Sequence, residues 1–529
     1  MIHFLGMVLA MIAPLLFGAV GLLLAVDPTS RRPGVGLAIN LRSGTSSASG
    51  GAIRILLVSV KNATGGSGTV ETLYPSVANA AAVGALAGYG GLAHLAAARL
   101  FEEHPTARVD FIMMAAASGN TAAGTITFDD TSPITSAQTV TARIAGKSVS
   151  IVWDVDETDV QAATKLVAQI AKQSKELPVT AANGGGTLAA VTLTFKSKGK
   201  AGLDCTYSVT MADGAGGNVT PAGTNLTGGT TEPDIANVIA AVVNREYRIW
   251  CPTLSNADMA TASTTSNLGK IRAHIRATDT GIGALLQSAH TACTDSTTNA
   301  KACTAQHDFE YFSHHLVRGA LSLPCEWTGA ICGAYARDIA NDPNHPFIKQ
   351  ELALAELYDS ATPQTDSLLA AEAEDLLASG VSYIGRTAQD VPRFERPIST
   401  YFEDADGNPD DRVLDVSKVF GLMAVGDDLR TQCEQRFKGK KLAKTLPKGN
   451  TPIPPNVIEE SDAKAFIVSR LRSQWVSAGV IRGDSLDAVI ADGSLVVQID
   501  STDETQLDVF LPLRVVPPHV KTSVYLVQA

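Results

Sequence analysis

The chain has 529 residues and a mass of 55.2 kDa, more than one hydrophobic core usually serves, so several domains are expected. Hydrophobic residues make up 45% and charged residues 18%, which excludes wholesale disorder. The net charge of -11 disfavours binding to duplex nucleic acid through phosphate neutralisation, so no nucleic acid is expected as a partner. Seven cysteines, odd in number and scattered, favour a reducing compartment over a disulfide framework.

The chain opens with an uncharged apolar stretch at residues 4–26, FLGMVLAMIAPLLFGAVGLLLAV, which is long enough to cross a bilayer. A signal peptide is disfavoured because only His3 precedes the stretch. A membrane anchor fits the length, and Arg31 and Arg32 would then hold the body in the cytoplasm. A start codon set too far upstream, or an apolar arm buried between subunits, would account for the stretch as well. Membrane contact by residues 4–26 therefore stays open.

The next segment, residues 32–50, predicts an extended N-terminal arm. Pro33 biases Arg32 away from helix, and apolar residues alternate along the arm before a Gly/Ser-rich stretch. The candidate arm residues are Val35, Leu37, Ile39 and Leu41.

Three apolar runs then have the length of buried parallel strands, at residues 53–60, 108–115 and 247–251. Ala-rich helical stretches such as 77–103 lie between them, and helical spacing returns at 232–244. Strands separated by helices predict an α/β domain with a parallel sheet, built from residues 51–118 and 231–385.

The intervening residues 119–230 are rich in Thr, Gly and Val and contain several strand-like pieces. A helix interrupts them, because Val160, Thr164, Val167 and Ile170 recur at helical spacing after an acidic start. We interpret this segment as a β-rich domain inserted into the α/β domain.

Residues 386–515 predict a C-terminal α+β domain, followed by a C-terminal arm at 516–529. Helices are expected at 417–437 and 461–478, the second with Ser461 as its N-cap. Period-two patterns predict strands at 495–499, 506–513 and 520–527. The last strand can pair in its own sheet or complete the sheet of a neighbour. Its candidate exchange residues are Val520, Thr522, Val524 and Leu526.

A search for catalytic and cofactor motifs finds no GxxxxGK[ST], GxGxxG, GxSxG or HExxH pattern that would support nucleotide, hydrolase or zinc chemistry. Neither a catalytic residue nor a cofactor is expected. The nearest metal-like cluster has spacings that match neither a zinc finger nor a ribbon. Its members are His290, Cys293, Cys303 and His307, with His314 and His315 nearby. We favour unrelated core and surface residues there, with a metal site or a Cys293–Cys303 disulfide as alternatives.

Two polar segments invite other functions. Asp404, Asp406 and Asn408 alternate as in a calcium loop, but Pro409 and Asp415 occupy the Gly and Glu positions, which favours a turn at Gly407. A basic run in this acidic chain is either a solvated face or a surface for an acidic partner. Its lysines are Lys438, Lys440, Lys441, Lys444 and Lys448.

Longer segments of the chain resemble the tail sheath proteins of Mu-like contractile bacteriophages. They are PCEWTGAICGAYARDIANDPNHPF (324–347), RPISTYFEDADGNPDDRVLDVSKVFGLMAVGDDLRTQCEQRFKGKKLA (396–443), the arm SRRPGVGLAINLRSG and the inserted segment with IAGKSVSIVW and VTLTFKSKGKAG. The resemblance covers residues 32 to 529 in order and leaves residues 1–31 uncovered. Since a sheath is made in the host cytoplasm, a mis-set start or a packed apolar extension is favoured over an anchor there.

The resemblance implies a non-enzymatic structural subunit with a subtilisin-like α/β central domain, found in the virion tail. Such subunits stack as hexameric rings around a tail tube, are joined by N- and C-terminal arms that extend neighbouring sheets, and contract to drive the tube through the host envelope. It implies copies of the chain, the tail tube, the baseplate and the tail terminator as partners. A tailocin or a membrane-tethered injection system, a membrane-anchored surface protein and a subtilisin-fold hydrolase are the alternatives.

Overall fold

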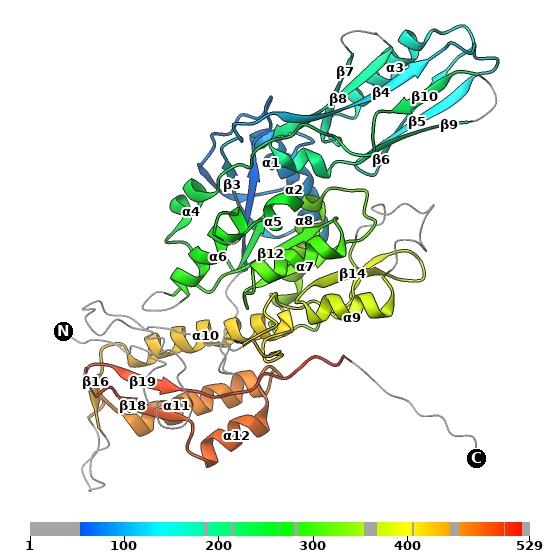
Figure 1. The fold of residues 1–529 in the computed structure, drawn as a ribbon. Helices are drawn as coiled ribbons and strands as arrows, with labels where there is room; N and C mark the ends of the chain where they lie inside the picture. The colour runs from blue at the N-terminus through cyan, green and yellow to red at the C-terminus, as the bar shows by residue number, and fades with distance from the viewer. Residues whose placement is uncertain are drawn as a thin grey trace, which may run out of the picture.

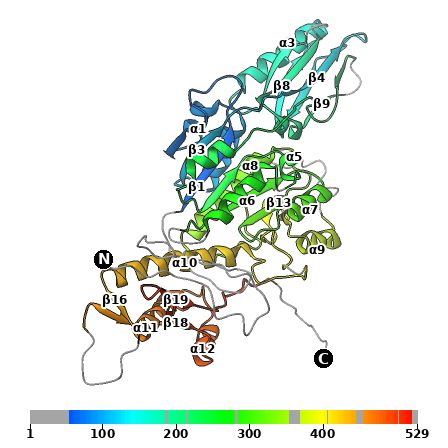
Figure 2. The same ribbon diagram turned by 60° about the vertical axis from the view of Figure 1, so that its left-hand side comes forward.

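The computed structural model describes residues 53–520, except 185–188, 213–215, 263, 280–283, 354–367, 405–406, 445–453 and 502. The chain is a mixed α/β protein with several sheets, arranged in three parts along one long axis (Figure 1). The inserted β-rich part lies at one end, the α/β body in the middle and the C-terminal domain at the other end (Figure 2). Helix α10 (Val416–Phe437) runs between the body and the C-terminal domain.

The α/β body is built on an eight-stranded sheet of order β15-β14-β13-β12-β11-β1-β3-β2. The six inner strands are parallel, and β2 and β15 pair antiparallel at the two edges. The predicted α/β domain with a parallel sheet is confirmed, and the subtilisin-like comparison stays a prediction. The strands are β1 (Arg54–Val60), β2 (Leu73–Val77), β3 (Arg108–Met114), β11 (Ile249–Pro252), β12 (Ser288–Cys293), β13 (Phe312–Leu316), β14 (Ser382–Arg386) and β15 (Pro392–Phe394).

Helices cover this sheet, and two of them pack unusually closely. Helices α2 (Leu92–Glu103) and α8 (Pro324–Ile339) meet at Gly329, where an added Cβ would lie 2.2 Å from the Ala96 carbonyl oxygen. Only glycine allows that approach. The predicted helical stretch 77–103 is broken into two helices at Gly88. The other helices are α1 (Ala80–Ala87), α4 (Ala236–Val242), α5 (Asn256–Met259), α6 (Asn267–Thr278), α7 (Thr297–Gln306) and α9 (Ala370–Ala378).

The inserted domain contains two antiparallel sheets and the predicted helix, α3 (Asp159–Lys172). The chain enters and leaves it side by side, since the amides of Gly119 and Asn120 donate to the hydroxyls of Thr231 and Thr230 at 2.9 and 3.1 Å. Its strands are β4 (Thr121–Asp129), β5 (Gln138–Ile144), β6 (Lys147–Trp153), β7 (Val179–Asn183), β8 (Ala190–Lys198), β9 (Tyr207–Met211) and β10 (Asn218–Pro221).

The C-terminal domain packs helices against a two-stranded antiparallel sheet of β18 (Val496–Ile499) and β19 (Leu507–Phe510). The predicted cap at Ser461 is wrong: α11 (Glu460–Arg470) has Glu459 as its N-cap, and the Ser461 hydroxyl donates to the Glu459 carboxylate. A π-helical turn (Leu471–Val476) follows α11. The remaining elements are β16 (Lys441–Ala443), β17 (Val457–Glu459) and α12 (Gly483–Ala491).

Candidate functional site: the joint at helix α10 and the assembly surfaces

Helix α10 contributes to two separate hydrophobic cores. Its first half buries Phe420, Leu422 and Met423 in the core that also holds the large sheet. Its second half is buried in the core of the C-terminal domain through Val425, Leu429, Cys433 and Phe437. A continuous helix is stiff over this length because each turn is hydrogen-bonded to the next. The helix therefore fixes the C-terminal domain relative to the α/β body.

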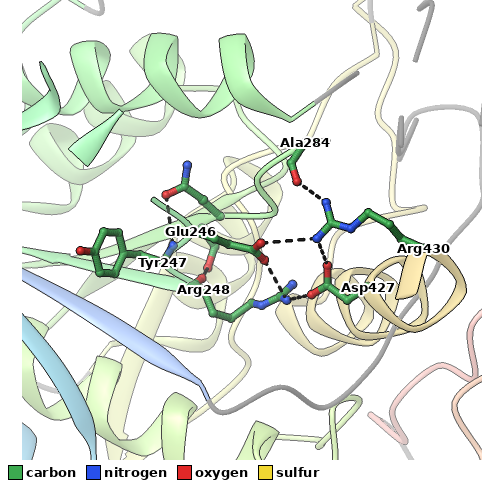
Figure 3. Close-up of polar contacts among 8 residues, drawn as sticks. Glu246, Tyr247, Arg248, Ala284, Asp427 and Arg430 are labelled. Carbon is green, nitrogen blue, oxygen red and sulfur yellow. Dashed lines mark hydrogen bonds and ion pairs between the residues drawn. The ribbon is translucent and has the colours of Figure 1, made fainter. Parts of the chain in front are cut away.

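A cluster of ion pairs crosses from the body to α10 where the two cores meet (Figure 3). Asp427 pairs with Arg248, which lies just before β11, and accepts from Arg430 at 2.7 Å. Glu246 lies 3.3 Å from Arg248 and 3.4 Å from Arg430, and Arg430 also donates to the Ala284 carbonyl. Burial lowers the pKa of Arg248, whose side chain is 12% exposed. We call these four charged residues the joint cluster.

The next residue, Asp428, makes the corresponding contacts with the C-terminal domain. Its carboxylate accepts from Arg470 at 2.5 and 2.7 Å and from the Trp475 indole at 2.8 Å. Two consecutive aspartates thus bind the helix to the body through Arg248 and to the C-terminal domain through Arg470. Charged groups this buried are tolerated because each has an opposite charge in contact.

The joint cluster was missed in the sequence, because its members are far apart in the chain. Arg248 and Asp427 are separated by 179 residues, and no local pattern links them. The one local signal is the spacing of Asp427 and Arg430, three residues apart on one helix.

Replacing Asp427 by alanine tests the joint cluster. We expect Asp427→Ala to lower the free energy of unfolding by about 2 kcal/mol, because Arg248 loses its closest carboxylate while Glu246 remains. Urea unfolding followed by tryptophan fluorescence measures the change. Asp487→Ala is the control: it breaks an exposed pair with Arg472 and should cost less than about 0.5 kcal/mol. Equal losses in the free energy of unfolding for the two variants would contradict a stabilising role for the joint cluster.

The chain leading to the C-terminal arm is held between the two domains. Val515 bridges to Ile481, and the amide of Val516 donates to the Val480 carbonyl at 2.9 Å. The Asn344 side chain, from the body, donates to the Val516 carbonyl at 3.0 Å. The arm predicted at 516–529 therefore starts from a fixed point. Val520 is 36% exposed, whereas Thr522, Val524 and Leu526 lie outside the described residues.

The sheet of β18 and β19 has two strands, and in the part of the chain that the structure describes neither pairs with a third. One face is buried on the domain core through Val497, Ile499, Leu507 and Val509. Phe510, at the end of β19, is 40% exposed. At the outer edge of β18 the Ile499 amide donates to the Glu460 carboxylate at 2.7 Å, whereas β19 presents an edge whose backbone groups can accept another strand.

The predicted lysine surface lies at the end of α10 and just beyond it. Lys438, Lys441 and Lys444 are exposed and Lys440 is half-buried, while Lys448 lies outside the described residues. Between residues 53 and 444, none of these lysines forms an ion pair with a described carboxylate. The surface gathers positive charge in an acidic chain.

The metal-like cluster lies in the buried core, not around a metal site. Both ring nitrogens of His290 are hydrogen-bonded to serines, to Ser288 at 2.9 Å and Ser313 at 2.8 Å. All seven cysteines are free and buried, so the Cys293–Cys303 disulfide alternative is wrong. Within the described residues no group of three His, Cys, Asp or Glu side chains is placed to hold a metal ion.

Serine and histidine side chains form a buried chain of hydrogen bonds across β12 and β13. Ser313 contacts His290 and, at 3.1 Å, His315, which contacts the Tyr335 hydroxyl at 3.0 Å. Neither histidine is hydrogen-bonded to a carboxylate of the described chain, so the acid of a Ser-His-Asp triad is missing there. The arrangement satisfies polar groups inside the sheet.

Burial lowers the pKa of His290 and of His314 to about 3. An unfolded histidine titrates near 6.5, so each costs stability as the pH falls from about 6.5 towards 3. Burial raises the pKa of Asp204 and of Glu232 to about 7. Protonation of these two carboxyls therefore stabilises the folded chain as the pH falls from about 7 towards 4. The global pH dependence therefore combines opposing contributions, and the histidines must be observed individually.

NMR of the chain labelled with carbon-13 in its histidine rings measures the protonation of each histidine separately. We expect the His290 and His314 signals to remain at neutral-imidazole positions at pH 5, while the urea-unfolded chain titrates near 6.5. His290→Gln assigns its signal. Native titration of either ring near 6.5 would show that these histidines are accessible to solvent rather than buried.

The remaining sequence candidates are surface features or lie outside the described residues. Asp404 accepts from the Asn408 amide at 2.9 Å across a turn with Gly407 at positive φ, and Asp406 is outside the described residues. The hydrophobic residues 4–26 and the arm residues Val35, Leu37, Ile39 and Leu41 are outside them too. From residue 53 to 520, gaps excepted, no helix is both long and apolar enough to cross a membrane.

The chain matches no model of a known protein family and no curated protein sequence. It is similar to two solved structures over most of its length. A sheath tail protein from Desulfitobacterium hafniense is 14% identical, with a TM-score of 0.41 over 88% of this chain and 94% of the other. A sheath tail protein from Listeria innocua is 12% identical, with a TM-score of 0.41 over 87% and 91%.

Proposed function

We propose that the chain is a structural subunit of a contractile tail sheath of the Mu-like kind. Copies polymerise as stacked hexameric rings around a tail tube and contract to drive the tube through the host envelope. The observation that carries the proposal is the two-stranded sheet of β18 and β19, in which β19 pairs with no further strand among the described residues. It supplies the receiving surface that a strand-exchanging polymer needs.

The arms provide the strands that this surface accepts. An isolated two-stranded sheet is marginally stable, and added strands satisfy its edge groups with main-chain hydrogen bonds. The N-terminal arm around Val35 to Leu41 and the C-terminal arm from Val520 to Val527 are the donors. The C-terminal arm leaves its own subunit at the point fixed by Asn344 and Val480, which suits it to reach a neighbour.

The joint at α10 supports the contraction step. Strand pairing between subunits survives rotation, but force applied at the C-terminal domain must reach the body. Asp427 and Asp428 bind α10 to the two parts, so the subunit rotates as one unit. The subtilisin-like body and the inserted domain then form the outer mass of each subunit, without catalysis and without a cofactor. The tube, the baseplate and the tail terminator are its proposed partners in a virion tail assembled in the host cytoplasm.

A charge placed on the receiving sheet tests the assembly surface. Phe510→Glu should reduce polymer formation at least tenfold, because an incoming strand would have to desolvate the carboxylate. Val243→Glu, at 43% exposed on another face, is the matched control and should polymerise normally. Sedimentation of the purified full chain measures the polymer. Normal sedimentation of Phe510→Glu, with its circular dichroism unchanged, would overturn this surface.

Reversing the lysine surface tests contact with the tube or with a neighbour. The triple variant Lys438→Glu, Lys441→Glu, Lys444→Glu should lower co-assembly with the tube protein, with a stronger effect at low salt. Unchanged co-assembly at low salt would show that these lysines only face solvent. Because the three residues are exposed, folding should be unaffected, as thermal unfolding would verify.

A further inference from the structure

A cleft of about 340 Å³ lies where the inserted domain meets the α/β body. Its body side is the glycine-rich loop after β1, with Thr64, Gly65 and Gly66, and the end of α1. Its other side comes from the inserted domain, through Ser174, Lys175 and Lys196. Neither the joint cluster nor the assembly surfaces involve this cleft.

The body side of the cleft has few free acceptors, because the loop uses the carbonyls at the end of α1. The amides of Asn62, Ser67 and Gly68 donate to the carbonyls of Ala87, Ala85 and Leu86, each at 2.9 Å. Gly65 and Gly66, with φ of 84° and 78°, allow the loop to turn back for these bonds. The negative end of the helix is therefore already neutralised.

Lys196 extends from β8 into this junction. Its ammonium donates to the Tyr89 carbonyl of the body at 3.0 Å and to the Ser174 carbonyl of the inserted domain. It reaches them past Gly90, where an added Cβ would lie 2.4 Å from the amine nitrogen. An ammonium has three donors, so one remains for a third acceptor.

Further positive charge surrounds Lys196. Lys175 lies over the Tyr89 ring, 5.1 Å from its centroid, and Lys147 donates to the Glu176 carbonyl at 2.8 Å. No ion pair joins any of the three lysines to a carboxylate in the described chain. The charge of the Glu176 side chain acts on nearby His94. Burial and Lys147 lower the pKa of Lys196 to about 8, as expected for a cation without a counter-ion.

We propose that this cleft is an oxyanion site in which Lys196 and Lys175 bind a phosphate or carboxylate group. The anion supplies the missing acceptor and counter-charge, and it links the inserted domain to the body through ligands from both. The oxyanion comes either from solution, as inorganic phosphate, or from an acidic side chain of an adjacent copy. The second source rests on the proposed polymer, and the first does not.

Thermal unfolding of the full chain at pH 7, with inorganic phosphate titrated at constant ionic strength, tests the first source. Phosphate should raise the melting temperature, with a rise that grows as the logarithm of phosphate concentration above the dissociation constant, because it binds the folded state. Lys175→Gln and Lys196→Gln should each weaken the apparent affinity about tenfold. Lys172→Gln removes the same charge on α3, outside the cleft, and should bind like the parent. Lys175 tests the site even if Lys196→Gln disturbs the domain junction.

Polymer formation by the same variants tests the second source. If phosphate gives no shift, but Lys175→Gln sediments at least tenfold less polymer than Lys172→Gln, the oxyanion is a carboxylate of a neighbouring copy. If phosphate gives no shift and the two variants polymerise alike, the site is overturned. A phosphate-dependent rise in melting temperature that Lys175→Gln and Lys196→Gln retain at the same phosphate concentrations would overturn it as well. If no variant polymerises, the phosphate titration alone decides.

Discussion

Helix α10 is the constraint on which the rest of the structure depends, because it is part of both hydrophobic cores. Phe420 lies in the core of the large sheet, and Leu429 lies in the core of the C-terminal domain. Neither core can move relative to the other without breaking the helix or exposing its apolar side chains. Asp427 and Asp428 add specific contacts in the two directions, so packing and charge pairing fix the same arrangement.

This rigidity allows the two-stranded sheet of β18 and β19 to transmit force to the body. A strand accepted by β18 or β19 is anchored to a domain that cannot rotate freely on the body, so force at the edge of the sheet reaches the whole subunit. A flexible connection would dissipate that force in the linker. The proposed oxyanion cleft would give the inserted domain a similar second attachment, through Lys196 and the loop after β1.

Much of the architecture could be predicted from local patterns. The apolar run of β1 and the helical spacing of α3 and α10 were sufficient to place these elements. Strands β12 and β13 escaped prediction because their sequences, SAHTAC and FSHHL, are polar. Inside the sheet Ser313 is hydrogen-bonded to both His290 and His315, and no single segment reveals this pairing of polar groups.

The candidate sites were less predictable for the same reason. The lysine surface and the arms are local features of the sequence, so local patterns are enough to name them. The pair of Arg248 and Asp427, and the approach of Lys196 to Tyr89, join residues far apart in the chain. Such contacts depend on how whole domains pack. Helix α11 also begins earlier than its local pattern predicts, since β17 ends at Glu459 and that residue, not Ser461, is the N-cap.

The most direct test of the central claim is a cryo-electron microscopy reconstruction of the assembled full chain. We predict hollow helical tubes in which strands from neighbouring copies extend the sheet of β18 and β19, while α10 holds the body and the C-terminal domain in a fixed arrangement. Dispersed monomers under all salt conditions, or tubes in which both edges of that sheet face solvent, would contradict it.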